Sequence, residues 1–75
     1  MNMNEKTEMK VDMIKNLALL LIKQNNNMTM EQALSTVFNS DIYQKVMNER
    51  TAFYYQSPKY VFAFLEDELL GRKTD

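Results

Sequence analysis

Cysteine and histidine are both absent from the 75 residues of this chain, and each absence excludes a class of function. Without cysteine the chain can form no disulfide and offers no thiolate to a metal ion or a substrate. Without histidine it lacks the commonest general base and metal ligand near neutral pH. Serine and threonine remain as nucleophiles, but Ser40 and Ser57 are better explained as helix caps. We therefore expect no enzyme activity, cofactor, metal site or small-molecule substrate.

The chain also lacks an excess of basic charge and a membrane-length apolar run. Nine Lys and Arg residues against ten Asp and Glu residues give a formal net charge of −1, whereas nucleic-acid-binding domains usually carry a basic patch. The apolar run at residues 17–22 is six residues long, far short of the roughly 20 residues that cross a bilayer. Lys23 follows it in place of a signal-peptide cleavage site. We expect a cytoplasmic protein with no membrane and no nucleic-acid partner.

The chain is short enough to form at most one domain. A single core in 75 residues gives only a few kcal/mol of net stability without disulfides, metal or association. Residues 1–8 are polar and patternless, so we expect a disordered tail there. We expect residues 9–71 to form one helical domain and residues 72–75 to form a second tail.

One long amphipathic helix is predicted from Met9 to Lys23. Apolar residues recur there at helical spacing, at Val11, Ile14, Leu17, Ala18, Leu21 and Ile22. Met13 and Leu20 widen the apolar face to about half the circumference, whereas Leu19 falls among the polar positions. So wide a face is more than one small neighbouring helix would cover.

Two short helices are predicted next. Thr29-Met30-Glu31-Gln32 matches a capping box, so a helix should begin at Met30 and run to about Phe38, burying Ala33, Leu34, Val37 and Phe38. Ser40 can cap a third helix, in which Ile42, Tyr43, Val46 and Met47 form the apolar face.

The last helix has the clearest start signal. Ser57 can act as its N-cap and Pro58 fits its first position, and Gly71 should end it after Leu70. The segment 52–56 before it has high β-propensity, so we expect an extended connector or a short strand that would need a second copy to pair with. The predicted fold is an all-α bundle of four helices, two of them short, with a core of Leu17, Leu21, Leu34, Phe38, Val46, Val61, Phe62 and Leu65.

Six of the eight aromatic residues lie between positions 53 and 64. Such a segment either closes the core or faces a partner, because exposed Tyr and Phe anchor interfaces. Core closure is the simpler interpretation, and an interface is the main alternative. The predicted partner-binding residues are Phe53, Tyr54, Tyr55, Tyr60, Phe64 and Leu19, which falls among the polar positions of its helix.

The acidic run at residues 66–68 does not suggest a metal site. Neighbouring residues on a helix diverge by about 100° and cannot converge on one ion. A solvated face is the simpler interpretation. The run lies near the end of the helix, where the dipole disfavours negative charge, while Lys59 lies near the start. That reversed pattern permits a partner-facing role.

The two short helices have the dimensions of a helix-turn-helix. The second would be the recognition helix, but it offers only Gln44 and Lys45 to DNA and carries Asp41 at the end that would contact bases. Two packed helices without a DNA role are the simpler interpretation.

The central and C-terminal parts resemble a family of small, uncharacterised, helical bacterial proteins. The resemblance covers roughly residues 29–70 and is carried by Ala33-Leu34-x-x-Val37-Phe38-Asn39-Ser40-x-x-Tyr43 and by Thr51-Ala52-Phe53-Tyr54-Tyr55-Gln56-Ser57-Pro58-x-Tyr60-Val61, with an acidic end at residues 66–69. Some members are encoded beside putative toxins of the ADP-ribosyltransferase type, which implies an antitoxin-like or accessory role. The chain departs from the family at Ala52, where glycine is expected, and at Val37, where an aromatic residue is more usual.

These observations favour a non-enzymatic protein-binding module, antitoxin-like or regulatory, that acts by covering the surface of another bacterial protein. One alternative is a small transcriptional regulator that uses the central helix pair. Another is a homodimer without a separate client, in which Leu19 and residues 53–55 pair across a two-fold axis.

Overall fold

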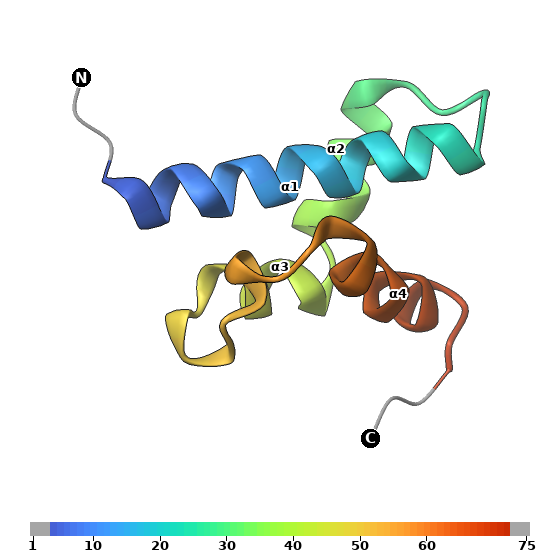
Figure 1. The fold of residues 1–75 in the computed structure, drawn as a ribbon. Helices are drawn as coiled ribbons and strands as arrows, with labels where there is room; N and C mark the ends of the chain where they lie inside the picture. The colour runs from blue at the N-terminus through green and yellow to red at the C-terminus, as the bar shows by residue number, and fades with distance from the viewer. Residues whose placement is uncertain (1–3, 73–75) are drawn as a thin grey trace.

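The computed structural model describes residues 4–72, and these residues form four α-helices with two 3-10 helices between the third and the fourth. The elements are α1 (Glu5–Gln24), α2 (Met30–Phe38), α3 (Asp41–Met47), η1 (Glu49–Thr51), η2 (Phe53–Tyr55) and α4 (Pro58–Leu69). No strand occurs between residues 4 and 72. Helix α1 runs along one side of the molecule and packs on α2, α3, η2 and α4 (Figure 1). The predicted all-α fold is confirmed.

Helix α1 begins at Glu5, four residues before the predicted Met9. The Asn4 side chain accepts a hydrogen bond from the backbone N–H of Thr7 at 2.8 Å and caps the helix. Glu5 and Glu8 lie in the first turn, where the helix dipole favours negative charge. Residues 5–8 are therefore helical, while residues 1–3 and 73–75 of the two predicted tails lie outside the described residues.

The predicted caps of the other helices are present. The Thr29 hydroxyl accepts from the Gln32 N–H at 3.1 Å, and the Gln32 side chain accepts from the Thr29 N–H at 2.9 Å. Ser57 accepts from the Tyr60 N–H at 3.2 Å at the start of α4. Gly71 has a left-handed φ of 75° just beyond the end of α4, as expected for a C-terminal stop.

Twelve buried apolar residues form one core, and α1 supplies five of them. They are Met13, Ile14, Leu17, Ala18, Leu21, Ala33, Val37, Ile42, Val46, Val61, Phe62 and Leu65. None of the helices in the described part of the chain combines the length and the apolar character that crossing a bilayer requires.

Two of the eight predicted core residues are not buried. Leu34 is only half-buried against the core, and Phe38 is 50% exposed. The reason is geometric: Ala33 and Val37, four residues apart, occupy the face of α2 that is turned inward, and the next residue in each case is rotated by about 100°. The prediction that Phe38 is a core residue was wrong.

The segment 52–56 is neither extended nor a strand. Ala52 has a left-handed φ of 57°, and Phe53–Tyr55 form a single 3-10 turn closed by the Gln56 N–H on the Phe53 carbonyl at 3.1 Å. The Phe53 N–H also donates to the Thr51 hydroxyl at 3.2 Å. The connector therefore presents no strand edge with which a second copy could pair.

Candidate functional site

A hollow lined almost entirely by apolar side chains lies where α1, α2 and α3 meet. It has a volume of about 270 Å³, and we call it the apolar groove. Its lining residues are Val11, Ile14, Lys15, Leu34, Phe38, Tyr43 and Met47. Lys15 is the one charged residue among these seven, so the groove offers an occupant mainly hydrophobic contact.

The rim of the apolar groove is unusually exposed for apolar residues. Ile14 is only 6% exposed, whereas Val11, Phe38 and Met47 are 49%, 50% and 38% exposed. These three residues come from three different helices, so their exposed surfaces surround a common hollow. Contiguous exposed apolar surface of this kind is typical of interaction sites.

A short turn between α2 and α3 fixes the aromatic wall of the apolar groove. The buried Ser40 hydroxyl donates to the Val37 carbonyl at 2.6 Å and accepts from the Tyr43 N–H at 3.1 Å. Tyr43 and Phe38 then meet edge to face, with ring centroids 5.2 Å apart and an interplanar angle of 82°. Such pairs add stability beyond burial, so Phe38 is held in place although half of it is exposed.

The predicted ring cluster is divided between core and surface. Phe53, Tyr54 and Phe64 are half-buried and pack against the core, with Phe53 and Phe64 centroids 5.3 Å apart. Tyr55 and Tyr60 are 72% and 51% exposed. The ring centroids of Tyr60 and Phe64 are 5.2 Å apart, and those of Tyr55 and Tyr54 are 6.1 Å apart. Three of the five rings therefore help to close the core, and two remain accessible to a partner.

The connector is also tied to α1 by charge. Glu49 accepts from Lys10 at 3.0 Å and from Lys6 at 3.3 Å, and Lys10 lies 5.7 Å from the centroid of the Tyr54 ring. The hydrogen bonds from Lys10 and Lys6 lower the pKa of the Glu49 carboxyl. The hydrogen bond to Glu49 raises the pKa of Lys6, and the negative charge of Glu49 raises it further. The two 3-10 helices are thus fastened to the N-terminal half of α1.

Leu19 lines a hollow between α1 and the start of α4. This hollow, which we call the Leu19 hollow, is lined by Asn16, Leu19, Leu20 and Lys23 of α1 and by Ser57, Pro58 and Lys59 at the start of α4. Leu19 itself is 45% exposed. None of the five predicted rings is among the residues that line this hollow.

The acidic run at residues 66–68 is engaged within the protein. Glu66 accepts from the Gln24 side chain, Asp67 pairs with Arg72 at 3.1 Å, and Glu68 accepts from the Asp41 and Ile42 N–H groups at 2.7 and 3.1 Å. Glu66 and Glu68 thus join α4 to the end of α1 and the start of α3, while Asp67 pairs at the surface just beyond its own helix. The partner-facing role of the run stays a prediction. Among residues 4–72, no three carboxylates gather closely enough to hold a metal ion.

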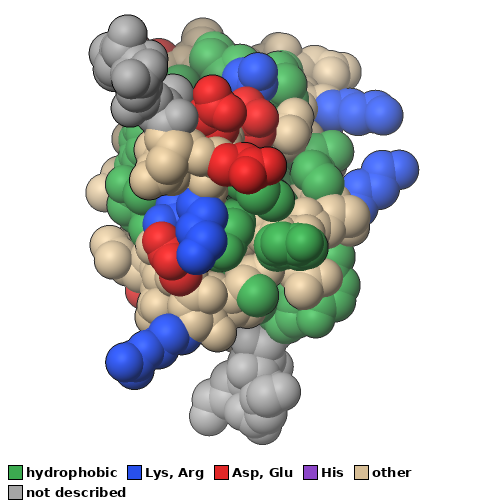
Figure 2. Space-filling view, turned by 60° about the vertical axis from the view of Figure 1, so that its left-hand side comes forward, with side chains coloured by type: hydrophobic (Ala, Val, Ile, Leu, Met, Phe, Trp, Pro, Cys, Tyr) green, Lys and Arg blue, Asp and Glu red, His purple; other side chains and the backbone are tan. Residues whose placement is uncertain are grey.

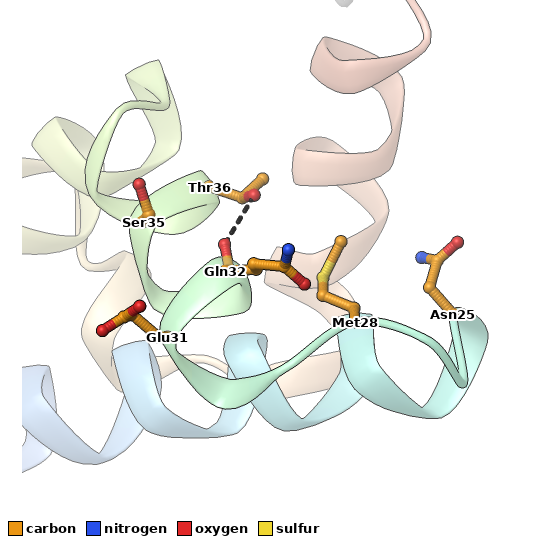
Figure 3. Close-up of a pocket in the computed structure, with 6 residues that line it drawn as sticks. All are labelled: Asn25, Met28, Glu31, Gln32, Ser35 and Thr36. Carbon is orange, nitrogen blue, oxygen red and sulfur yellow. Dashed lines mark hydrogen bonds between the residues drawn. The ribbon is translucent and has the colours of Figure 1, made fainter.

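A larger hollow of about 770 Å³ lies beside α2, but its side chains do not converge. It is lined by Asn25, Met28, Glu31, Gln32, Ser35 and Thr36. Figure 3 shows these side chains spread along α2 and the turn before it, with the Thr36 hydroxyl bonded to the backbone carbonyl of Gln32 at 2.9 Å. Several of its polar groups are thus already used by the helix and its cap, so we assign no function to this hollow.

Hydrophobic and charged side chains alternate over the surface at the N-terminal end of α1. Figure 2, which brings this end forward, shows exposed hydrophobic side chains between acidic and basic ones.

No known protein family, curated protein or solved structure matches this chain. The apolar groove and the Leu19 hollow are therefore distinguished from the rest of the surface only by the side chains that line them and by the exposure of those side chains.

Proposed function

We propose that this protein is a non-enzymatic protein-binding module that holds its partner in the apolar groove. The observation that carries the proposal is the convergence of Val11, Phe38 and Met47 around the buried Ile14. Interface centres are poor in charge and rich in aromatic residues and methionine. A partner that covers this groove removes apolar surface from water and has to desolvate few charges.

An antitoxin-like or regulatory role in the cytoplasm of a bacterium is the specific form of the proposal. The resemblance carried by residues 29–70 supports it, as does the absence of histidine and cysteine from the chain. In this role the module acts by occlusion: it covers a surface of another protein and performs no chemistry on it.

The helix-turn-helix alternative receives less support from the geometry. Helix α3 would be the recognition helix, yet its N-terminal end carries Asp41 and also the Glu68 carboxylate, which is bound to the N–H groups of Asp41 and Ile42. Two carboxylates at this end oppose contact with phosphates. Salt-dependent binding to the protein's own promoter, weakened by Lys45→Ala, would restore this alternative.

Site-specific photo-crosslinking in the native cells tests the proposal. A benzophenone amino acid placed at Phe38 or Met47 should give an adduct of one defined mass. The matched control is Gln44, which is exposed on α3 but does not line the apolar groove. The proposal is wrong if Gln44 gives the same adduct as Phe38, or if no groove position gives one.

The mass of the adduct also separates a client from self-association. A product of twice the 8.9 kDa chain mass would assign the groove to a second copy and favour the homodimer. A product with a different protein, lost after Val11→Ser, would support the client.

A further inference from the structure

We infer that the Leu19 hollow is a second docking surface, which takes an apolar side chain from a partner segment that also carries acidic residues. This surface is separate from the apolar groove and does not depend on what the groove binds. The hollow has an apolar centre. Leu19 is exposed on the side of α1 that faces away from the core, and the half-buried Leu20 and Pro58 lie beside it in the same hollow.

The charge around the Leu19 hollow has one sign. Lys23 from α1 and Lys59 from α4 both line it, and no acidic residue is among its seven lining residues. The ion pairs between residues 4 and 72 use Lys6, Lys10 and Arg72 instead.

Lys59 adds to this positive character because of its place in α4. It is the second residue of that helix, where the helix dipole is also positive. Since Lys23 and Lys59 are in none of the ion pairs of the described residues, both ammonium groups can meet a carboxylate from a partner.

A protein segment fits this surface better than a membrane. Lipid-binding clusters usually hold four to eight basic residues, whereas this hollow has two and the chain has a formal net charge of −1. A partner segment with one leucine or phenylalanine flanked by aspartate or glutamate matches both the apolar centre and the basic rim.

Selection of peptides from a random 12-residue phage library on the immobilised full-length protein tests the chemistry. Enriched sequences should combine a large apolar residue with Asp or Glu. Synthetic versions should bind more weakly at 500 mM than at 50 mM salt, because exposed ion pairs are screened. Replacing the acidic residues of the peptides with Asn and Gln should also weaken their binding.

Variants of the protein locate the binding. Leu19→Ser should weaken the selected peptides about three- to tenfold, since about half of Leu19 is already covered and burying a whole leucine contributes roughly 1.5–3 kcal/mol. Lys23→Gln with Lys59→Gln should weaken them about three- to tenfold. Phe38→Ser is the matched control: it removes an exposed apolar side chain from the apolar groove and should leave these peptides bound.

Four outcomes would overturn the inference. They are the absence of enriched peptides, enrichment of neutral or basic ones, equal binding by the Leu19→Ser variant, and stronger binding to vesicles with 30% phosphatidylserine than to the peptides. Peptides lost with Phe38→Ser but kept with Leu19→Ser would overturn this inference while supporting the apolar groove as a binding site.

Discussion

The connector and the apolar groove contain the same kinds of side chain but use them in opposite ways. In the connector, η2 packs on α1 and α3, and Phe53 also meets Phe64 of α4, so the rings of Phe53 and Tyr54 complete the core. In the apolar groove, Phe38 is the last residue of α2, and half of the surface of Phe38 stays exposed. The difference shows that an aromatic residue is buried when other helices pack around its element, however many aromatic residues lie near it in the sequence. Only a ring that such packing leaves exposed can meet a partner.

The largest expected effect tests that contrast directly. Phe53→Ala should lower the free energy of unfolding by about 2 kcal/mol, less than for a fully buried ring because Phe53 is half-buried. Phe38→Ala should cost less than about 1 kcal/mol, since it mainly removes the contact with Tyr43. Urea denaturation of both variants measures the difference. Equal costs, or a larger cost at Phe38, would contradict the division into core and surface.

The next effect concerns how α4 supports the wall of the apolar groove. Glu68→Ala should destabilise the protein by about 1–2 kcal/mol, because the N–H groups of Asp41 and Ile42 lose a charged acceptor. Asp67→Ala, which removes a surface ion pair with Arg72, is the matched control and should cost under about 0.5 kcal/mol. Thermal or urea unfolding measures both. If the two substitutions cost the same, Glu68 is not the cap that its geometry indicates.

A smaller effect, of opposite sign, is expected in the connector. Ala52→Gly should stabilise the protein by about 0.5–1 kcal/mol, because an L-residue in the left-handed region is strained and the relief exceeds the added entropy of the unfolded chain. Ala52→Val should destabilise it, since a branched side chain fits this conformation less well. Urea midpoints decide the order, which should be Gly above Ala above Val. A destabilised glycine variant would show that the left-handed turn carries no strain.

The smallest effect comes from the charged tie between α1 and η1. The pKa of Glu49 is lowered from 4.5 and that of Lys6 is raised from 10.5. Glu49 therefore contributes stability above pH 4.5 that is lost as the pH falls through its lowered pKa. Lys6 contributes stability below pH 10.5 that is lost as the pH rises through its raised pKa.

Glu49→Gln isolates this contribution. The melting temperature of the variant should lie slightly below that of the wild type at neutral pH. The gap should close at acid pH and at 500 mM salt, because the ion pairs are exposed. A gap that stays constant with pH would mean that the side chain acts through packing and not through charge.

The helices could be predicted from the sequence because their signals are local. Thr29, Ser40 and Ser57 each cap a helix within three residues of themselves, and Gly71 ends one. The start of α1 was misplaced because its cap, Asn4, precedes a polar turn without apolar periodicity.

The proposed partner surfaces could be predicted only in part because exposure depends on contacts that are distant in sequence. Leu19 was recognisable as an apolar residue on a polar face, and its exposure is confirmed. Phe38 and Met47 were assigned to apolar faces that are too wide for their short helices. Val37 and Phe38 point about 100° apart on α2, and because α2 packs mainly on α1, Val37 is covered and Phe38 is not. The role of Glu68 lies beyond local patterns, since its backbone partners are 26 and 27 residues away.

The Glu68 contact also couples the apolar groove to a helix that does not line it. Helix α3 has seven residues, too few to be stable alone, and two of its first N–H groups find their acceptor in α4. Tyr43 and Met47, which line the apolar groove, belong to this helix. A change in α4 that displaces Glu68 would therefore loosen the wall of the groove without touching any residue that lines it.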